Sequence, residues 1–266
     1  MRDPFKKSVF PNGLTLVTER QPQFRSLSIG VWVKAGTRHE RPTEAGVSHF
    51  LEHMLFKGTG SRSALDIARA VDQVGGEFNA FTAREYTCFH ILLLGRDLGL
   101  AADILSDILL DSKFDADEME RERRVILQEI AMVEEAPEEL AHDLFFEQIY
   151  GGNKRSGHGL GKPILGTESS IRRMKRAELV RYFRERYRPD QLIVAVAGDV
   201  SHEAVKRKLA PLASRRWPGR PEGRGLPKPF DETPPPPKPG FWWCERRTEQ
   251  LHLLWGVRGP SYSSND

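Results

Sequence analysis

The chain has 266 residues, enough for one large domain or for one domain and part of another. Hydrophobic residues make up 39% and charged residues 29%, as in an ordinary folded protein, and the formal net charge of +3 gives no reason to expect nucleic acid as a partner. No apolar run reaches the length of a membrane-spanning helix and the first residues lack a signal-peptide core, so we expect no membrane partner and a cytoplasmic protein, or a periplasmic one if a leader was removed.

Strand-like patterns open the chain and return twice. Asn12-Gly13 joins two strand-like pieces and is a strong hairpin signal. The alternation of apolar and polar residues over 26–36 predicts a longer strand. Residues 77–94 are rich in Phe, Thr, Tyr and Ile and predict two strands around a short turn, and residues 190–200 predict a buried strand.

Helical spacing of apolar residues fills most of the chain between these strands. The predicted helices cover residues 44–56, 63–76, 97–110, 115–136, 137–150, 175–187 and 201–213. Strands and helices alternate in blocks, and hairpins are present. This order predicts an α+β fold in which helices pack on a mainly antiparallel sheet.

The composition changes in the last fifth of the chain, where a Pro/Gly-rich stretch predicts a linker over residues 215–239. The following segment, GFWWCERRTEQLHLLWGVRG, resembles GLTLVTERQPQFRSLSIGVWVKAG near the start: a Gly-led strand, a charged turn and a longer apolar strand. We therefore expect one domain over residues 1–214 and, over residues 240–266, the truncated beginning of a second copy. The alternative is one more hairpin on the sheet of the first domain.

The stretch HFLEHMLF contains two histidines four positions apart, with a glutamate directly before the second. On a helix, His49 and His53 lie about 40° apart, so their imidazoles share a face and can converge on a zinc ion. Glu52 falls on the neighbouring edge, where it can reach a water at the metal. This H-x-x-E-H spacing is a zinc-peptidase pattern. The alternative is a core helix with buried histidines, but an unpaired buried carboxylate costs on the order of several kcal/mol.

A hydrolytic zinc site needs a third protein ligand, and the predicted helix over 115–136 offers one. At about 100° per residue, Glu122 and Glu129 fall on its apolar face, where zinc would supply the compensating charge. Glu129 is the better direct ligand, and Glu122 can hydrogen-bond a histidine. The alternative is that both pair with arginines such as Arg123 or Arg124. The apolar face is expected to consist of Val125, Ile126, Ile130 and Val133.

Four motifs, GVSHFLEHMLFKGT, VGGEFNAFTAREYT, ERRVILQEIAM and PILGT, together resemble the pitrilysin/insulinase superfamily of zinc peptidases. The greatest similarity is to the bacterial branch that resembles the β-subunit of mitochondrial processing peptidase. The resemblance runs from about Phe10 to Val200, with the motifs in the order of the family. The sequence HGLG at 158–161 departs from the family, which usually has a proline after the histidine.

This resemblance implies a site made of five residues. One Zn²⁺ per chain would be held by His49, His53 and Glu129. Glu52 would be the general base, and Glu122 would be a supporting carboxylate. The resemblance therefore assigns to these positions the same chemistry that the helical spacing indicates.

The resemblance also implies a substrate site and a partner. Asn79 and Ala80 would lie on an edge strand, where an extended peptide substrate adds as a β-strand. Superfamily members have two homologous α+β halves that enclose the peptide, and only the first half binds zinc. The expected partner is thus a missing C-terminal half or a second subunit, with a homodimer as one arrangement. The expected function is zinc-dependent hydrolysis of extended peptides or small unfolded proteins; the alternatives are a non-catalytic subunit or scaffold, or a zinc-loaded but inert fragment.

Overall fold

The computed structural model describes residues 5–151, 158–214, 217, 234–247 and 249–261. They have an α+β fold, as the sequence predicts. The strands are β1 (Phe5–Val9), β2 (Thr15–Arg20), β3 (Ser26–Val33), β4 (Glu77–Thr82), β5 (Thr87–Leu94) and β6 (Leu192–Gly198). The helices are α1 (Val47–Leu55), α2 (Ala64–Asp72), α3 (Leu98–Asp111), α4 (Ala116–Glu135), α5 (Pro137–Tyr150), α6 (Glu168–Arg173), α7 (Arg176–Arg186), α8 (His202–Lys208) and α9 (Ala210–Ser214).

The strands form one six-stranded sheet in the order β1-β2-β6-β3-β5-β4. Only β2 and β6 run parallel among these neighbours, so the sheet is mainly antiparallel, as predicted. The hairpin at Asn12-Gly13 joins β1 to β2, and a short turn joins β4 to β5. β4 is an edge strand, and Asn79 and Ala80 therefore lie on an edge of the sheet.

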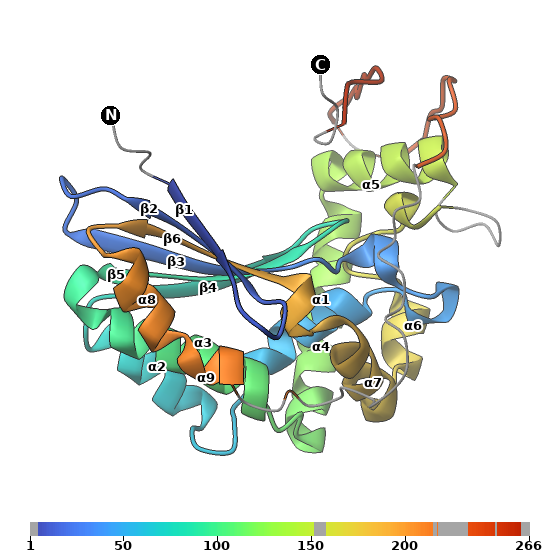
Figure 1. Cartoon of the computed structure of the whole chain (residues 1–266). Coiled ribbons are helices and arrows are strands. Elements are labelled where there is room, and N and C mark those ends of the chain that lie inside the picture. Colours follow the sequence, from blue (N-terminus) through green and yellow to red (C-terminus); the bar gives the residue numbers. More distant parts are fainter. Residues whose placement is uncertain (1–4, 152–157, 215–216, 218–233, 248, 262–266) are drawn as a thin grey trace.

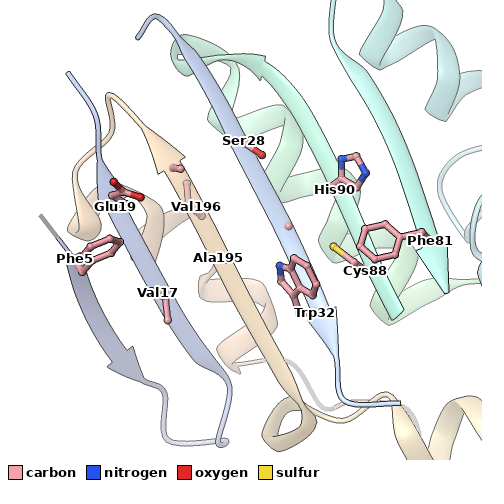
Figure 2. Close-up of a pocket in the computed structure, with 12 residues that line it drawn as sticks. Phe5, Val17, Glu19, Ser28, Trp32, Phe81, Cys88, His90, Ala195 and Val196 are labelled. Carbon is pink, nitrogen blue, oxygen red and sulfur yellow. The ribbon is translucent and has the colours of Figure 1, made fainter. Parts of the chain in front are cut away.

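Helices cover one face of the sheet, and in Figure 1 the other face carries no helix of the described chain. The covered face supplies fully buried side chains such as Ile29, Val31 and Val194, which pack with apolar residues of the helices. The open face has a hollow of about 420 Å³. Figure 2 shows its small residues, such as Ser28 and Ala195, between larger side chains. This distribution follows from the period of two along each strand.

The start of α1 is held by two other parts of the chain. Gly46, which precedes α1, has φ +87°, a left-handed conformation that favours glycine. A Cβ atom there would lie 2.5 Å from the carbonyl oxygen of Leu165, in the PILGT motif. The buried Glu40 carboxylate accepts hydrogen bonds from the backbone N–H groups of Gly46 and Ser48, both at 2.9 Å. These contacts fix the helix that carries HFLEH.

The strands predicted after residue 239 do not form in the part of this segment that the structure describes. Residues 240–247 and 249–261 contain neither helix nor strand, and Phe241 and Trp255 are 78% and 89% exposed. The alternative of an added hairpin is wrong for the described residues, because there the sheet ends at β1 and β4. A hairpin needs further strands or a packed face to be stable, and the described residues supply neither here. The second domain over 240–266 stays a prediction, and most of the predicted linker over 215–239 lies outside the described residues.

Candidate metal centre

Two helices bring three ligand-type side chains together. His49 and His53 project from α1, and Glu129 projects from α4, which packs against α1. The Nε2 atoms of the two histidines lie 3.3 Å apart, and Glu129 Oε2 lies 3.7 Å from His49 Nε2 and 3.6 Å from His53 Nε2. The three residues predicted as metal ligands therefore form one compact triangle of donor atoms.

The dimensions and the chemistry of this triangle fit zinc. With zinc–ligand bonds of about 2.0–2.1 Å, two ligands of a tetrahedral site are about 3.3–3.4 Å apart. Glu129 Oε2 is buried and has no hydrogen-bond partner among the described residues. An unpaired buried carboxylate oxygen is costly. A cation held by His49, His53 and Glu129 would satisfy it.

The two imidazoles direct their Nε2 atoms toward each other, as a shared metal would require. Burial, with the neighbouring His53, lowers the pKa of His49 to about 3, so its ring is neutral. His53 Nδ1 lies 2.9 Å from Glu122 Oε2. Because an ionised carboxylate only accepts hydrogen bonds, Nδ1 of His53 carries the proton and donates it. The lone pair of His53 is thus on Nε2, the atom that faces His49 and Glu129.

Glu122 is buried and pairs with His53 and Lys57 rather than with an arginine. Its side chain is 8% exposed, and its Oε1 lies 2.8 Å from Lys57 Nζ. Arg123 instead pairs with Glu120 and donates to the carbonyl oxygen of Met174. The arginine alternative therefore does not describe the surroundings of Glu122.

Glu52, next to His53 on α1, is linked to the end of β4. Its half-buried carboxylate accepts a hydrogen bond from Thr82 Oγ1 at 2.5 Å. Burial raises the pKa of Glu52 and outweighs the hydrogen bond from Thr82, which lowers it. Glu52 is thus a carboxylate whose environment increases its affinity for a proton, as a general base requires.

Asn79 and Ala80 lie on β4, the same strand as Thr82. Asn79 is exposed, and its Oδ1 accepts a hydrogen bond from the backbone N–H of Ala80 at 2.8 Å. The side chain of Asn79 therefore occupies a backbone donor of the edge strand. An incoming strand that uses this donor would displace the Asn79 side chain.

The sequence predictions missed two contacts and placed two residues, Val125 and Val133, on an apolar face where neither is buried. Lys57 follows His53 by four positions, just after the end of α1, and Thr82 follows Ala80 by two and shares its side of the strand. The spacing places both residues near the predicted site, but it does not state which side chains they contact. Val125 was expected on the apolar face of α4 but is 38% exposed. The buried residues of that helix are Met119, Glu122, Ile126 and Ile130, because this narrower stripe alone faces the core.

The fold and the site define an α+β protein that presents H-x-x-E-H on a helix. The family described as Insulinase (Peptidase family M16) matches residues 15–167, and the family described as Peptidase M16 inactive domain matches residues 173–266. The chain belongs to the M16 peptidase family. Its similarity to the processing-peptidase branch in particular stays a prediction.

Similar proteins include two that are named uncharacterized zinc proteases. One, from Mycobacterium leprae, is 41% identical over 97% of this chain and 56% of its own length. The other, from Bacillus subtilis, is 39% identical over 96% of this chain and 59% of its own length. The chain thus spans a little over half the length of these relatives.

Solved structures share the fold. A protease from Helicobacter pylori superposes with a TM-score of 0.78 and 23% identity, over 85% of this chain and 53% of that one. A peptidase M16 inactive domain from Pseudomonas fluorescens gives a TM-score of 0.75 and 18% identity, over 88% of this chain and 54% of that one. None of the helices in the described part of the chain has the length and apolarity that a bilayer span requires.

Proposed function

We propose that this chain is the zinc-binding part of a metallopeptidase that hydrolyses peptide bonds in extended peptides or small unfolded proteins. The observation that carries the proposal is the convergence of His49, His53 and Glu129 on a space that fits one Zn²⁺. Membership of a peptidase family and the names of the relatives support it.

Each side chain at the site would have a separate role in hydrolysis. Bound Zn²⁺ would lower the pKa of a water to about 7 and polarise the scissile carbonyl. Glu52 would take the proton of the attacking water and pass it to the leaving amine. Thr82 would hold one oxygen of Glu52 in place. Glu122 would keep the proton on His53 Nδ1, so that Nε2 remains a ligand.

The edge strand β4 would bind the substrate. A peptide in extended conformation can add to the open edge, and its main chain would then pair with backbone groups near Asn79 and Ala80. Thr82 ends the same strand and hydrogen-bonds to Glu52, so this pairing would bring the peptide to the base. Because binding as an added strand uses the main-chain groups of the substrate, it favours unfolded segments over folded proteins.

A partner would complete the substrate chamber. The chain spans 56–59% of the relatives from Mycobacterium leprae and Bacillus subtilis, so a C-terminal half or a second subunit, including a second copy of this chain, would supply the opposite wall. Activity of this chain alone is therefore not required by the proposal. A compartment in the cytoplasm, or the periplasm after removal of a leader, stays a prediction.

The test compares Glu52→Gln with the wild type in the protein extended to the length of its relatives. We expect the variant to keep about one zinc per chain and to lose peptide hydrolysis by a factor of about 100 or more, because general-base catalysis contributes roughly 10²–10⁴. Glu135→Gln, at an exposed position of α4, is the control and should cleave normally. Cleavage at the wild-type rate by Glu52→Gln would falsify the mechanism.

Zinc analysis separates the proposal from its alternatives. A scaffold would not rebind about one zinc per chain after chelation and zinc return. A zinc-loaded but inert fragment would rebind zinc and cleave peptides only after the C-terminal half is added. Assays of the 266-residue chain with and without that half distinguish the two results.

A further inference from the structure

We propose that Lys57 is a positioning residue that aligns His53 for metal binding by acting through Glu122. The inference rests on the proposed zinc site, and it adds a residue that would touch neither metal nor substrate. Lys57 lies just after α1, four positions from His53, while Glu122 comes from α4.

The contacts form a chain of three groups. Lys57 Nζ lies 2.8 Å from Glu122 Oε1, and His53 Nδ1 lies 2.9 Å from Glu122 Oε2. Each oxygen of the Glu122 carboxylate thus has its own donor: His53 in α1 for one and Lys57, just after α1, for the other. A carboxylate held at both oxygens cannot rotate without breaking a charge-assisted hydrogen bond. Lys57 therefore fixes the direction in which Glu122 accepts the proton of His53.

Burial makes this contact necessary. The side chain of Glu122 is 8% exposed, and a carboxylate so placed needs a compensating charge. Lys57, whose side chain is 28% exposed, supplies that charge from the rim of the site. Without it, Glu122 would turn toward water, and Nδ1 of His53 would lose its acceptor. The ring could then rotate Nε2 away from Glu129, which is 3.6 Å from it.

If Lys57 acted only through its charge, its removal would change zinc affinity in the direction opposite to the one that positioning predicts. The inference is therefore testable. Removing a cation close to a zinc site would strengthen the binding of Zn²⁺ by Coulomb's law. Loss of alignment would weaken binding instead, because partners behind a metal ligand contribute a factor of about 10–100 in metal affinity. The sign of the change therefore distinguishes positioning from simple electrostatics.

The experiment measures zinc affinity of the full 266-residue chain by competition with a chelator. We expect Lys57→Met to bind zinc about tenfold or more weakly, and Lys57→Arg, which keeps charged donors, to recover most of the affinity. Lys206→Met removes the same charge from an exposed position on α8 and should bind as the wild type does. Circular dichroism of the zinc-free proteins checks that each variant is folded.

The same substitution in a Glu122→Gln protein tests whether Lys57 acts through Glu122. In a Glu122→Gln protein, Lys57→Met should have less than about a threefold further effect, because the two substitutions break the same chain of contacts. NMR of the imidazole nitrogens should show the proton of His53 on Nδ1 in the wild type and a mixture of tautomers in Lys57→Met. Equal or tighter zinc binding by Lys57→Met overturns the inference, as does an undiminished effect in the Glu122→Gln protein. A wild type that binds no zinc overturns the proposed function itself.

Discussion

His53 Nδ1 and Glu122 Oε2 lie 2.9 Å apart, although 69 positions separate the two residues in the sequence. The other ring nitrogen of His53 faces Glu129, two helical turns further along α4. One imidazole therefore bridges two carboxylates of one helix. A metal bound by Glu129 would link α1 to α4 at a second position, two helical turns from Glu122. Metal binding would then stabilise the packing of the two helices, and their packing would favour metal binding.

Zinc should stabilise the folded chain. A ligand that binds only the native state at about 1,000 times its Kd adds about 4 kcal/mol to the free energy of unfolding. We expect a clear rise in Tm when zinc is added to the metal-free protein. Glu129→Gln should remove most of that rise, because the amide is a poorer zinc ligand. Glu134→Gln, at an exposed position of the same helix, should leave it intact; an equal loss in both variants would contradict the site.

Thr82→Val should slow the reaction without releasing the metal. The valine methyl group replaces the hydroxyl that holds Glu52 at 2.5 Å, and a displaced base loses roughly 10–100-fold in rate. The loss should appear in kcat more than in KM, since β4 keeps its edge. Thr82→Ser keeps the hydroxyl and should retain most of the activity. The measurement is steady-state kinetics of the protein at the length of its relatives, with zinc content determined in parallel.

Much of the site can be predicted from the sequence, because its residues lie on two helices whose residue spacing shows which side chains share a face. The four-residue spacing of His49 and His53 puts them on one face, and the apolar stripe of α4 puts Glu122 and Glu129 inward. These two helices pack together in the structure, where the ligand atoms of His49, His53 and Glu129 meet. Periodicity alone left the pairing of the helices open, and the resemblance to a family supplied it.

Contacts between segments that are distant in the sequence cannot be predicted from the spacing of residues within one segment. The bond from Thr82 to Glu52 depends on how β4 lies against α1, and no spacing within either element states that distance. The resemblance of the segment after residue 239 to the first strands predicts strands there, yet a strand forms only where a neighbour completes its hydrogen bonds. Strand propensity is a property of the segment, whereas strand formation is a property of its surroundings.

The helix that carries the two histidines should depend on its buried face. Leu51 is 0% exposed in the core, and Leu51→Ala should lower the free energy of unfolding by about 2–5 kcal/mol, the usual range for a cavity of this kind. Leu65→Ala is the matched substitution on α2, where the side chain is 55% exposed, and it should cost less than about 1 kcal/mol. Urea unfolding of the metal-free chain measures both, and equal losses would contradict this placement of α1.

Acid should destabilise the region that precedes α1 through His39. Burial, together with the charges of Arg186 and Arg38, lowers the pKa of His39 from 6.5 to about 4. The unfolded chain therefore binds a proton more readily than the folded chain. The contribution of His39 is fully present above pH 6.5 and is lost as the pH falls toward 4, with a slope of at most about 1.4 kcal/mol per pH unit.

His39→Asn isolates this contribution. His39 Nδ1 accepts the backbone N–H of Gly36 at 3.1 Å, a bond that protonation of Nδ1 would break and that an asparagine oxygen can replace. The free energy of unfolding, measured by urea between pH 7.5 and 4.5 with a chelator present, should fall less steeply in His39→Asn than in the wild type. His252→Asn, at an exposed position, is the control and should follow the wild type. A wild-type slope in His39→Asn would show that other groups cause the acid sensitivity, because only His39 loses its titration in that variant.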